Sequence, residues 1–162
     1  MTATQQIEPS TTAALSAALL PTRFGPLPFQ PGQIWIAATP LPGFESLQRF
    51  GLISLQAERP FVWLQSLDDP AVSFLLVQAV HFGLRFAHLP AGTLPMVMVL
   101  LPGQGERTLR AHRQAPLLFD AQAGTLSQHI VEADEVEGDG VFAPQAKAAE
   151  PAGFAERVLA LV

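Results

Sequence analysis

The sequence contains no cysteine and no tyrosine, and its only lysine is Lys147. Without cysteine the chain cannot form a disulfide, use a thiol as nucleophile or hold zinc through thiolates. A chain without disulfides fits a reducing compartment. We therefore expect a cytoplasmic protein.

Charge is also scarce, because charged residues make up 14% of the chain against the roughly 25% of an average soluble domain. The net charge is −5 and the isoelectric point is near 5.2. Nucleic-acid binding requires clustered lysine and arginine to displace counterions from phosphates. We therefore expect no direct nucleic-acid contact, and a mildly acidic surface suits a basic protein partner better.

The sequence has no apolar segment of the roughly 20 residues that cross a bilayer as a helix. The first 20 residues, MTATQQIEPSTTAALSAALL, contain no Lys or Arg, so they do not match a secretory signal, which begins with a positive region. We expect no membrane partner. The polar start of the chain predicts a flexible N-terminal tail over residues 1–22.

Short apolar segments separated by turn residues occupy most of the chain from Gly32 onward. GQIWIAA, FGLISLQ, FVWLQSL, AVSFLLVQAV and PMVMVLLP are rich in β-branched, aromatic and aliphatic residues, which is typical of strands. HFGLRFAHL alternates, and predicts Phe82, Leu84 and Phe86 on one face of a further strand. We expect a mostly β fold, a small antiparallel barrel-like domain over residues 23–138.

The last part of the chain differs from the strand-rich region. In EPAGFAERVLALV, Pro151 suits the first turn of a helix, and the apolar Phe154, Val158 and Leu161 recur at helical spacing. Residues 139–162 are therefore predicted to form a linker and a short amphipathic C-terminal helix.

No catalytic motif is present in the sequence. There is no Gly-x-Ser-x-Gly, and the four histidines lack the tight spacing of a metal site. Asp68 and Asp69 are adjacent, so their side chains diverge, and with Pro70 they predict a turn. We expect a non-enzymatic protein that uses no metal or cofactor.

The stretch LPGFE, Leu41 to Glu45, predicts a rigid corner. Pro42 fixes φ and Gly43 accepts positive φ, so the pair favours a tight turn that holds Phe44 and Glu45 in fixed directions. Two readings remain open at this point: the corner presents Phe44 to a partner, or Phe44 packs beneath the turn while Glu45 is solvated.

A set of short motifs follows in a fixed order along the chain: Phe24-Gly25, Leu41 to Glu45, Pro60-Phe61, Leu64-Gln65-Ser66, and Asp69-Pro70 followed by Phe74. In order and spacing this set resembles the FliW family of flagellar assembly factors. The resemblance runs from about Phe24 to Glu137. Near its end, HRQAP keeps Ala115-Pro116 but has His112 and Arg113 where the family has Asn and Leu.

The resemblance implies a regulatory function. Members of this family bind the translational repressor CsrA, the carbon storage regulator, and relieve its repression of flagellin messenger RNA; they also bind flagellin itself. The residues expected to contact a partner are Phe44, Glu45, Asp68, Asp69, His112, Arg113, Glu132, Asp134 and Glu135. The residues expected to have structural roles are Leu41, Pro42, Gly43, Leu64, Gln65, Ser66 and Pro116.

Two alternatives remain open at the level of sequence. A barrel whose Phe82, Leu84 and Phe86 face lines a cavity would bind a small apolar ligand. A degenerate family member that has lost the repressor would serve as a structural or interaction module through its C-terminal helix. The run from Glu132 to Glu137, here assigned to a basic partner, is also what a solvated strand end shows.

Overall fold

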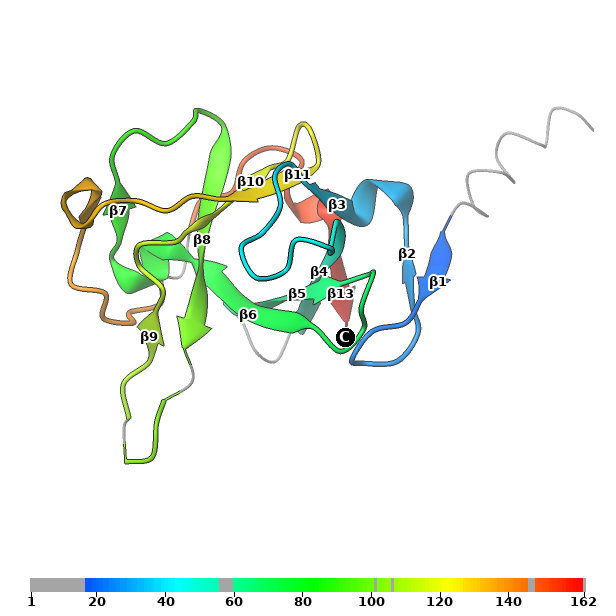
Figure 1. Cartoon of the computed structure of the whole chain (residues 1–162), viewed down its shortest axis with the longest axis horizontal. Helices are drawn as coiled ribbons and strands as arrows, with labels where there is room; N and C mark the ends of the chain where they lie inside the picture. Colours follow the sequence, from blue (N-terminus) through cyan, green and yellow to red (C-terminus); the bar gives the residue numbers. More distant parts are fainter. Residues whose placement is uncertain (1–16, 56–59, 101, 106, 146–147, 162) are drawn as a thin grey trace, which may run out of the picture.

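A closed ring of seven strands forms the centre of the molecule in the computed structural model, which describes residues 17–55, 60–100, 102–105, 107–145 and 148–161 (Figure 1). The ring order is β10-β11-β3-β4-β5-β6-β8, and β8 pairs back with β10. All pairings in the ring are antiparallel except β11 with β3. The strands are β3 (Ile34–Ala37), β4 (Arg49–Leu55), β5 (Val62–Ser66), β6 (Ser73–Gln78), β8 (Thr93–Leu100), β10 (Leu117–Asp120) and β11 (Thr125–Gln128).

Smaller elements surround the ring. An antiparallel hairpin of β1 (Ala18–Leu20) and β2 (Leu27–Phe29) lies at one end in Figure 1, and β7 (Arg85–Phe86) with β12 (Val136–Glu137) lies at the other. The remaining elements are β9 (Arg110–Ala111), β13 (Val158–Leu161), and the 3-10 helices η2 (Pro31–Gln33), η4 (Ala79–Phe82), η5 (Ala133–Glu135) and η6 (Ala155–Arg157). The predicted mostly β, barrel-like fold is confirmed.

The predicted N-terminal tail falls largely outside the described residues, which begin at residue 17. Within it, Ala18–Leu20 is a strand paired with Leu27–Phe29. Residues 18–20 therefore form part of a hairpin and not of a flexible tail.

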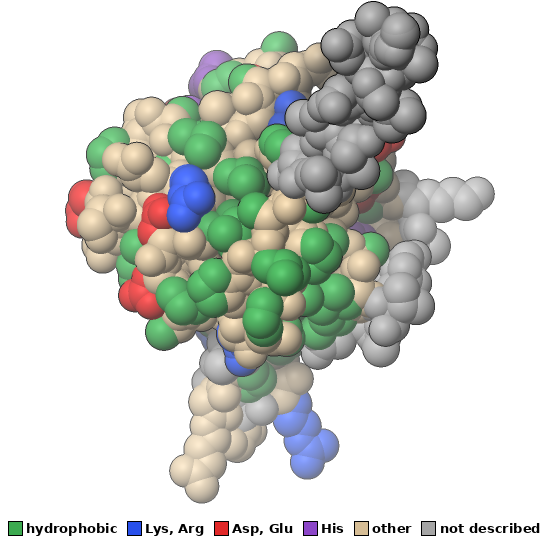
Figure 2. Space-filling model, turned by 90° about the vertical axis from the view of Figure 1, so that its right-hand side faces the viewer, with side chains coloured by type: hydrophobic (Ala, Val, Ile, Leu, Met, Phe, Trp, Pro, Cys, Tyr) green, Lys and Arg blue, Asp and Glu red, His purple; other side chains and the backbone are tan. Residues whose placement is uncertain are grey.

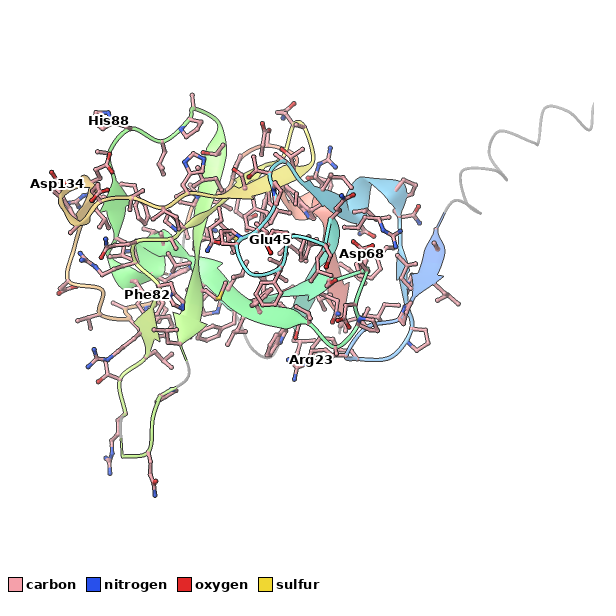
Figure 3. The ribbon with its side chains drawn as sticks, in the orientation of Figure 1. Arg23, Glu45, Asp68, Phe82, His88 and Asp134 are labelled. Carbon is pink, nitrogen blue, oxygen red and sulfur yellow. The ribbon has the colours of Figure 1, made fainter. Side chains whose placement is uncertain are left out.

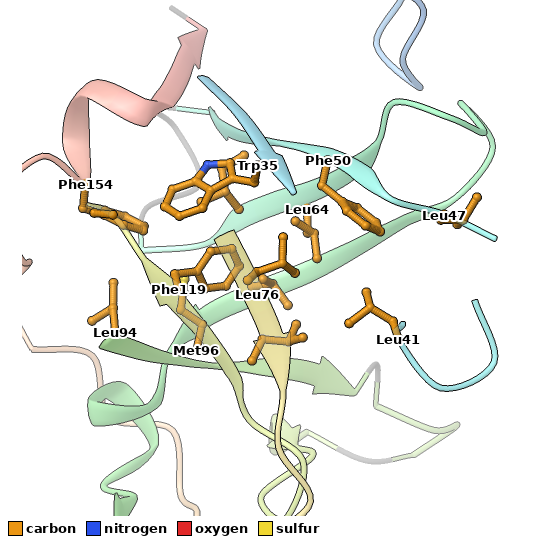
Figure 4. Close-up of a cluster of buried hydrophobic side chains, with 14 residues drawn as sticks. Trp35, Leu41, Leu47, Phe50, Leu64, Leu76, Leu94, Met96, Phe119 and Phe154 are labelled. Carbon is orange, nitrogen blue, oxygen red and sulfur yellow. The ribbon is translucent and has the colours of Figure 1, made fainter. Parts of the chain in front are cut away.

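Side chains fill the interior of the ring. Trp35 and Phe119 meet edge to face, with ring centroids 5.1 Å apart, and Phe154 packs beside both (Figure 4). This geometry is favoured because the positive edge of one ring faces the negative face of the other. The other buried members of this cluster include Leu41, Phe50, Leu52, Leu64, Leu76, Met96 and Leu126.

The segment HFGLRFAHL is not one alternating strand. Ala79–Phe82 forms the 3-10 helix η4, which Gly83 ends in the left-handed conformation at φ 65°. Phe82 and Leu84 are buried in a second hydrophobic cluster with Val97 and Val136. Both side chains therefore contribute to a packed cluster. Neither is among the residues that line the groove of about 620 Å³ described below.

His81 is buried within η4, at 3% exposure. Its Nδ1 accepts a hydrogen bond from the Gln145 backbone N–H at 2.9 Å, and its carbonyl accepts one from Ala143 N–H. Burial lowers the pKa of His81 below its ordinary value. A neutral imidazole thus holds the segment that follows β12 against the ring.

The predicted C-terminal amphipathic helix is wrong. Residues 155–157 form a single 3-10 turn, and Val158–Leu161 is a strand that pairs in parallel with Leu52–Leu55 of β4. The helical pattern covers few turns, and short helices are marginal without packing along one face. The edge of β4 instead offers backbone partners to a sequence rich in Val and Leu.

Candidate partner-binding surface

The corner at Leu41 to Phe44 is a type II turn, as the Pro-Gly pair predicts. Leu41 carbonyl accepts the Phe44 N–H at 2.8 Å, Pro42 occupies the second position, and Gly43 has φ 84°. Leu41 is buried in the interior cluster, and so is Leu47, whose N–H donates to Phe44 carbonyl. The core therefore anchors both ends of the corner.

The side chains of Phe44 and Glu45 lie at this corner. Phe44 is 36% exposed, and its ring meets the Phe74 ring edge to face at 5.1 Å. The Glu45 carboxylate accepts the Gly43 N–H at 3.0 Å, and this bond, together with the N–H of Glu45 itself, lowers the pKa of its exposed carboxyl. Phe44 is thus neither buried beneath the turn nor fully projecting, and Glu45 is tied back to the turn.

Asp68 joins the corner to the turn that follows β5. Its Oδ2 accepts the N–H groups of Gln48 at 2.7 Å and Arg49 at 2.9 Å, and its Oδ1 accepts the Arg49 Nε–H at 2.9 Å. Burial raises the pKa of Asp68, but these three donors together bring it below its ordinary value. Asp68 holds two segments together, so much of its hydrogen-bonding capacity is used within the chain.

Gln65 and Ser66 form the buried floor of the same turn. Gln65 accepts the Arg23 N–H at 3.0 Å and donates to the carbonyls of Ser66 and Pro70, while Ser66 Oγ accepts the N–H groups of Asp68 and Asp69. Side chains that bond nearby backbone groups in this way fix the path of the backbone through the turn.

Leu64 and Pro116 are buried elsewhere in the fold. Leu64 packs in the interior cluster and pairs with Leu52 across β4 and β5. Pro116 precedes β10, and its carbonyl accepts the N–H of His129. Proline at a strand start loses no ladder bond, as expected.

The remaining predicted contact residues lie at the far end of the molecule. Figure 3 shows Asp134 well separated from Asp68, and Asp134 and Glu132 are exposed around η5. Arg113 Nη2 donates to Gly138 carbonyl at 3.0 Å, which places it beside the same segment. His112 is exposed, and its N–H donates to Met98 carbonyl. The acidic residues therefore form two separate groups.

A third surface is apolar. Figure 2 shows the side of the molecule that carries the β1–β2 hairpin, where hydrophobic side chains gather and charged ones are few. Phe24, Trp63, Leu159 and Leu161 are partly buried there around the buried Phe29. The Arg23 guanidinium lies 4.2 Å from the Trp63 ring centroid, a cation–π distance.

Two of these arginines were not singled out from the sequence. Arg49 pairs with Asp68, and Arg23 donates to Ser73 Oγ at 3.0 Å as well as stacking on Trp63. Arg49 lies 19 residues from Asp68 in the sequence, and Arg23 lies 50 residues from Ser73. The one feature of the sequence that pointed to a role for Arg49 at the corner is its position four residues after Glu45.

The Asp68→Asn substitution should lower the free energy of unfolding at pH 7 by about 1 to 2 kcal/mol. It removes the negative charge that strengthens the three hydrogen bonds to this partly exposed side chain. Asp69→Asn is the matched control, since its Oδ1 still accepts the Ala71 N–H, and should change stability by less than about 0.5 kcal/mol. Urea titration measures both. Equal losses would contradict the role of Asp68.

The same pair of proteins has an expected pH dependence. The pKa of Asp68 is lowered on folding, so its contribution is present above the ordinary value of 3.8 and is lost as pH falls through the lower folded value. The difference between wild type and Asp68→Asn should therefore shrink in that acidic range. A difference that stays constant down to pH 2 would contradict this linkage.

The geometry defines a class, a small closed β-barrel with an exposed turn at Leu41 to Glu45 and an apolar outer face. Within the described residues no group of three metal-binding side chains occurs, and no helix has the length and apolar character to span a membrane. The model of the FliW protein family matches residues 18–138. The chain belongs to the FliW family.

Individual relatives agree with this family. The flagellar assembly factor FliW of Syntrophotalea carbinolica is 28% identical over 124 residues, which cover 68% of this chain and 87% of the relative. The FliW of Moorella thermoacetica is 27% identical over 127 residues, 70% of this chain and 80% of that protein. A crystal structure of the flagellar assembly factor FliW superposes with a TM-score of 0.62 at 21% identity, covering 78% of this chain and 97% of that one.

Proposed function

We propose that this protein is a flagellar assembly factor that binds the translational repressor CsrA and flagellin, and so relieves repression of flagellin translation. The observation that carries the proposal is the family match over residues 18–138, which includes the Leu41 to Glu45 corner. Its relatives are named flagellar assembly factors. The partner identities come from the resemblance to that family.

The mechanism is occupancy without covalent change or cofactor. Flagellin bound to the factor keeps it from the repressor, and export of flagellin frees the factor to bind CsrA. Both partners meet this chain in the cytoplasm. The corner, held by the core at Leu41 and Leu47, presents Phe44 in a fixed direction, so little side-chain entropy is lost when a partner covers it.

The acidic residues around η5 supply the attraction to a basic partner. Glu132 and Asp134 are exposed there, and like charges gathered at one end steer an oppositely charged protein. Because Asp68 is engaged by Gln48 and Arg49, this second group is the better candidate for the repressor contact.

Calorimetric titration of the purified chain with CsrA and, separately, with flagellin of the same organism tests the proposal. Saturable binding to both is expected, and heat from neither would overturn it. Phe44→Ala should weaken at least one complex by about tenfold or more, whereas Leu100→Ala, at a matched exposure of 37%, should not. Neutralising Glu132, Asp134 and Glu135 together should weaken CsrA binding most at low salt, and unchanged affinity would remove this acidic group from the interface.

A further inference from the structure

Residues 150–161 lie beyond the part of the chain that matches the family, and they pack on the barrel like a bound peptide. β5 occupies one edge of β4 across Phe50–Ser54, and β3 takes the first part of the other edge. β13 adds in parallel along the rest of that edge, opposite Leu52–Leu55. The ring closes through β8 and β10 without β13, so the added strand is not needed for closure.

The first anchor of this segment is Phe154. It is buried, and its ring lies 5.8 Å from the Trp35 ring and 6.3 Å from the Phe119 ring (Figure 4). All the aromatic partners come from the ring strands β3 and β10. Trp35 and Phe119 thus form an aromatic pocket, called here the Trp35 socket. The side chain of Phe154 fills this pocket, although residue 154 belongs to none of the seven ring strands.

The second anchor is Arg157. Its Nε donates to Ala121 carbonyl at 2.6 Å and its Nη1 to Gly32 carbonyl at 2.9 Å, while its own carbonyl accepts the Trp35 Nε1–H at 3.1 Å. A Cβ on Gly124 would lie 2.7 Å from Nη1, so glycine there leaves room for the guanidinium. Backbone carbonyls of two separate segments, the 3-10 helix η2 and the turn after β10, converge on this one side chain.

The rest of the segment is held less tightly. Val158, Leu159 and Leu161 are only partly buried, and Ala160 is exposed. A groove of about 620 Å³ runs beside the strand, with Val158 and Ala160 on one side and Phe61, His81 and Gln145 among the other lining residues. Peptide recognition by strand addition combines main-chain pairing along a sheet edge with pockets for side chains. Here one buried aromatic anchor, one hydrogen-bonded arginine and a partly exposed strand follow that arrangement.

We propose that the β4 edge, the Trp35 socket and the carbonyls of Gly32 and Ala121 form a peptide-binding site, which the chain's own residues 150–161 occupy. The site accepts in exchange an extended partner segment with an aromatic residue, an arginine three positions later and aliphatic residues directly after it. This pattern of residue types is copied from the chain's own residues 150–161, which are called the cis segment below. The strand-pairing part of the site lies opposite Leu52–Leu55, whereas Asp68 bonds Arg49 at the start of β4. The test below uses neither CsrA nor flagellin, so its outcome is independent of the proposed function.

The cis segment is covalently linked to the barrel, so its effective concentration at the site is high. A separate peptide of the same sequence should therefore bind the wild-type protein poorly. Phe154→Ala combined with Arg157→Ala in the full chain removes both anchors and leaves Trp35, Gly32 and Ala121 unchanged. A fluorescent peptide of residues 150–162 should then bind at least about tenfold more tightly than to wild type by anisotropy. A peptide carrying the same two alanines is the control and should not bind.

A double variant that keeps its circular dichroism spectrum but does not bind the peptide would overturn the proposal. A dimer in light scattering, with the segment exchanged between copies, would replace the partner by a second copy and also overturn it. Hydrogen exchange on the unmodified chain gives an independent test in case the double variant does not fold. Amides of Val158–Leu161 should exchange at least about tenfold faster than those of β5, and equal rates would show that the segment does not open separately.

Discussion

Replacing Trp35 by alanine should lower the free energy of unfolding by about 3 to 5 kcal/mol, the range for an aromatic side chain lost from a core. Trp35 is fully buried and contacts Phe119 and Phe154. The variant also loses the indole N–H that pairs with Arg157 carbonyl. Because the three rings share one site, the surrounding side chains have little freedom to fill the cavity. Guanidinium titration followed by circular dichroism measures the loss.

Trp35→Phe is the matched control. It keeps a ring in the interior but removes the donor to Arg157 carbonyl, and should cost about half as much or less. Its loss should appear partly as faster hydrogen exchange in β13, because Arg157 precedes that strand directly. A loss below about 1 kcal/mol for Trp35→Ala would mean that the socket is not part of the cooperative core.

The strands that sequence reasoning located are those whose pattern is local. Four strands, Ile34–Ala37, Arg49–Leu55, Val62–Ser66 and Thr93–Leu100, overlap segments that the sequence predicts as strands from their β-branched, aromatic and aliphatic residues. The Pro42-Gly43 turn was equally predictable, because proline and glycine restrict or permit φ wherever they occur. These features depend on no distant partner.

The two misassigned segments depend on distant partners. η4 replaces a strand because Gly83 takes a left-handed φ and His81 receives the N–H of residue 145. Val158–Leu161 is a strand because the β4 edge lies beside it, about 100 residues earlier in the chain. An apolar pattern at positions 154, 158 and 161 fits a helix or an edge strand equally well, and packing decides between them.

The candidate site shows the same division. The sequence predicted a turn at Asp68 and Asp69. It did not show that Asp68 bonds Gln48 and Arg49, whereas the Asp69 carboxylate accepts the N–H of Ala71 within its own turn. Both aspartates were expected to contact a partner together with Glu132, Asp134 and Glu135, but the fold places Asp68 far from Asp134 (Figure 3). Distance between surface charges follows from topology, which local patterns do not contain.

Gly138→Ala should be the most damaging glycine substitution at the η5 end of the molecule. Gly138 has φ 115°, and a Cβ there would overlap the carbonyl oxygen of Gly83. The obstacle is backbone, so no rotamer change relieves it. We expect a loss of about 2 to 4 kcal/mol, the sum of left-handed strain and a displaced segment.

Gly140→Ala separates these two costs. Gly140 also has positive φ, 71°, but a Cβ there meets no atom within 4 Å. It should lose only the strain, about 1 kcal/mol, so the difference between the two variants reports the clash with Gly83. Because β12 ends one residue before Gly138 and pairs with β7, the clash should also speed exchange at Arg85 and Phe86. Equal losses in thermal unfolding would show that the segment shifts freely and that β12 does not fix the acidic end.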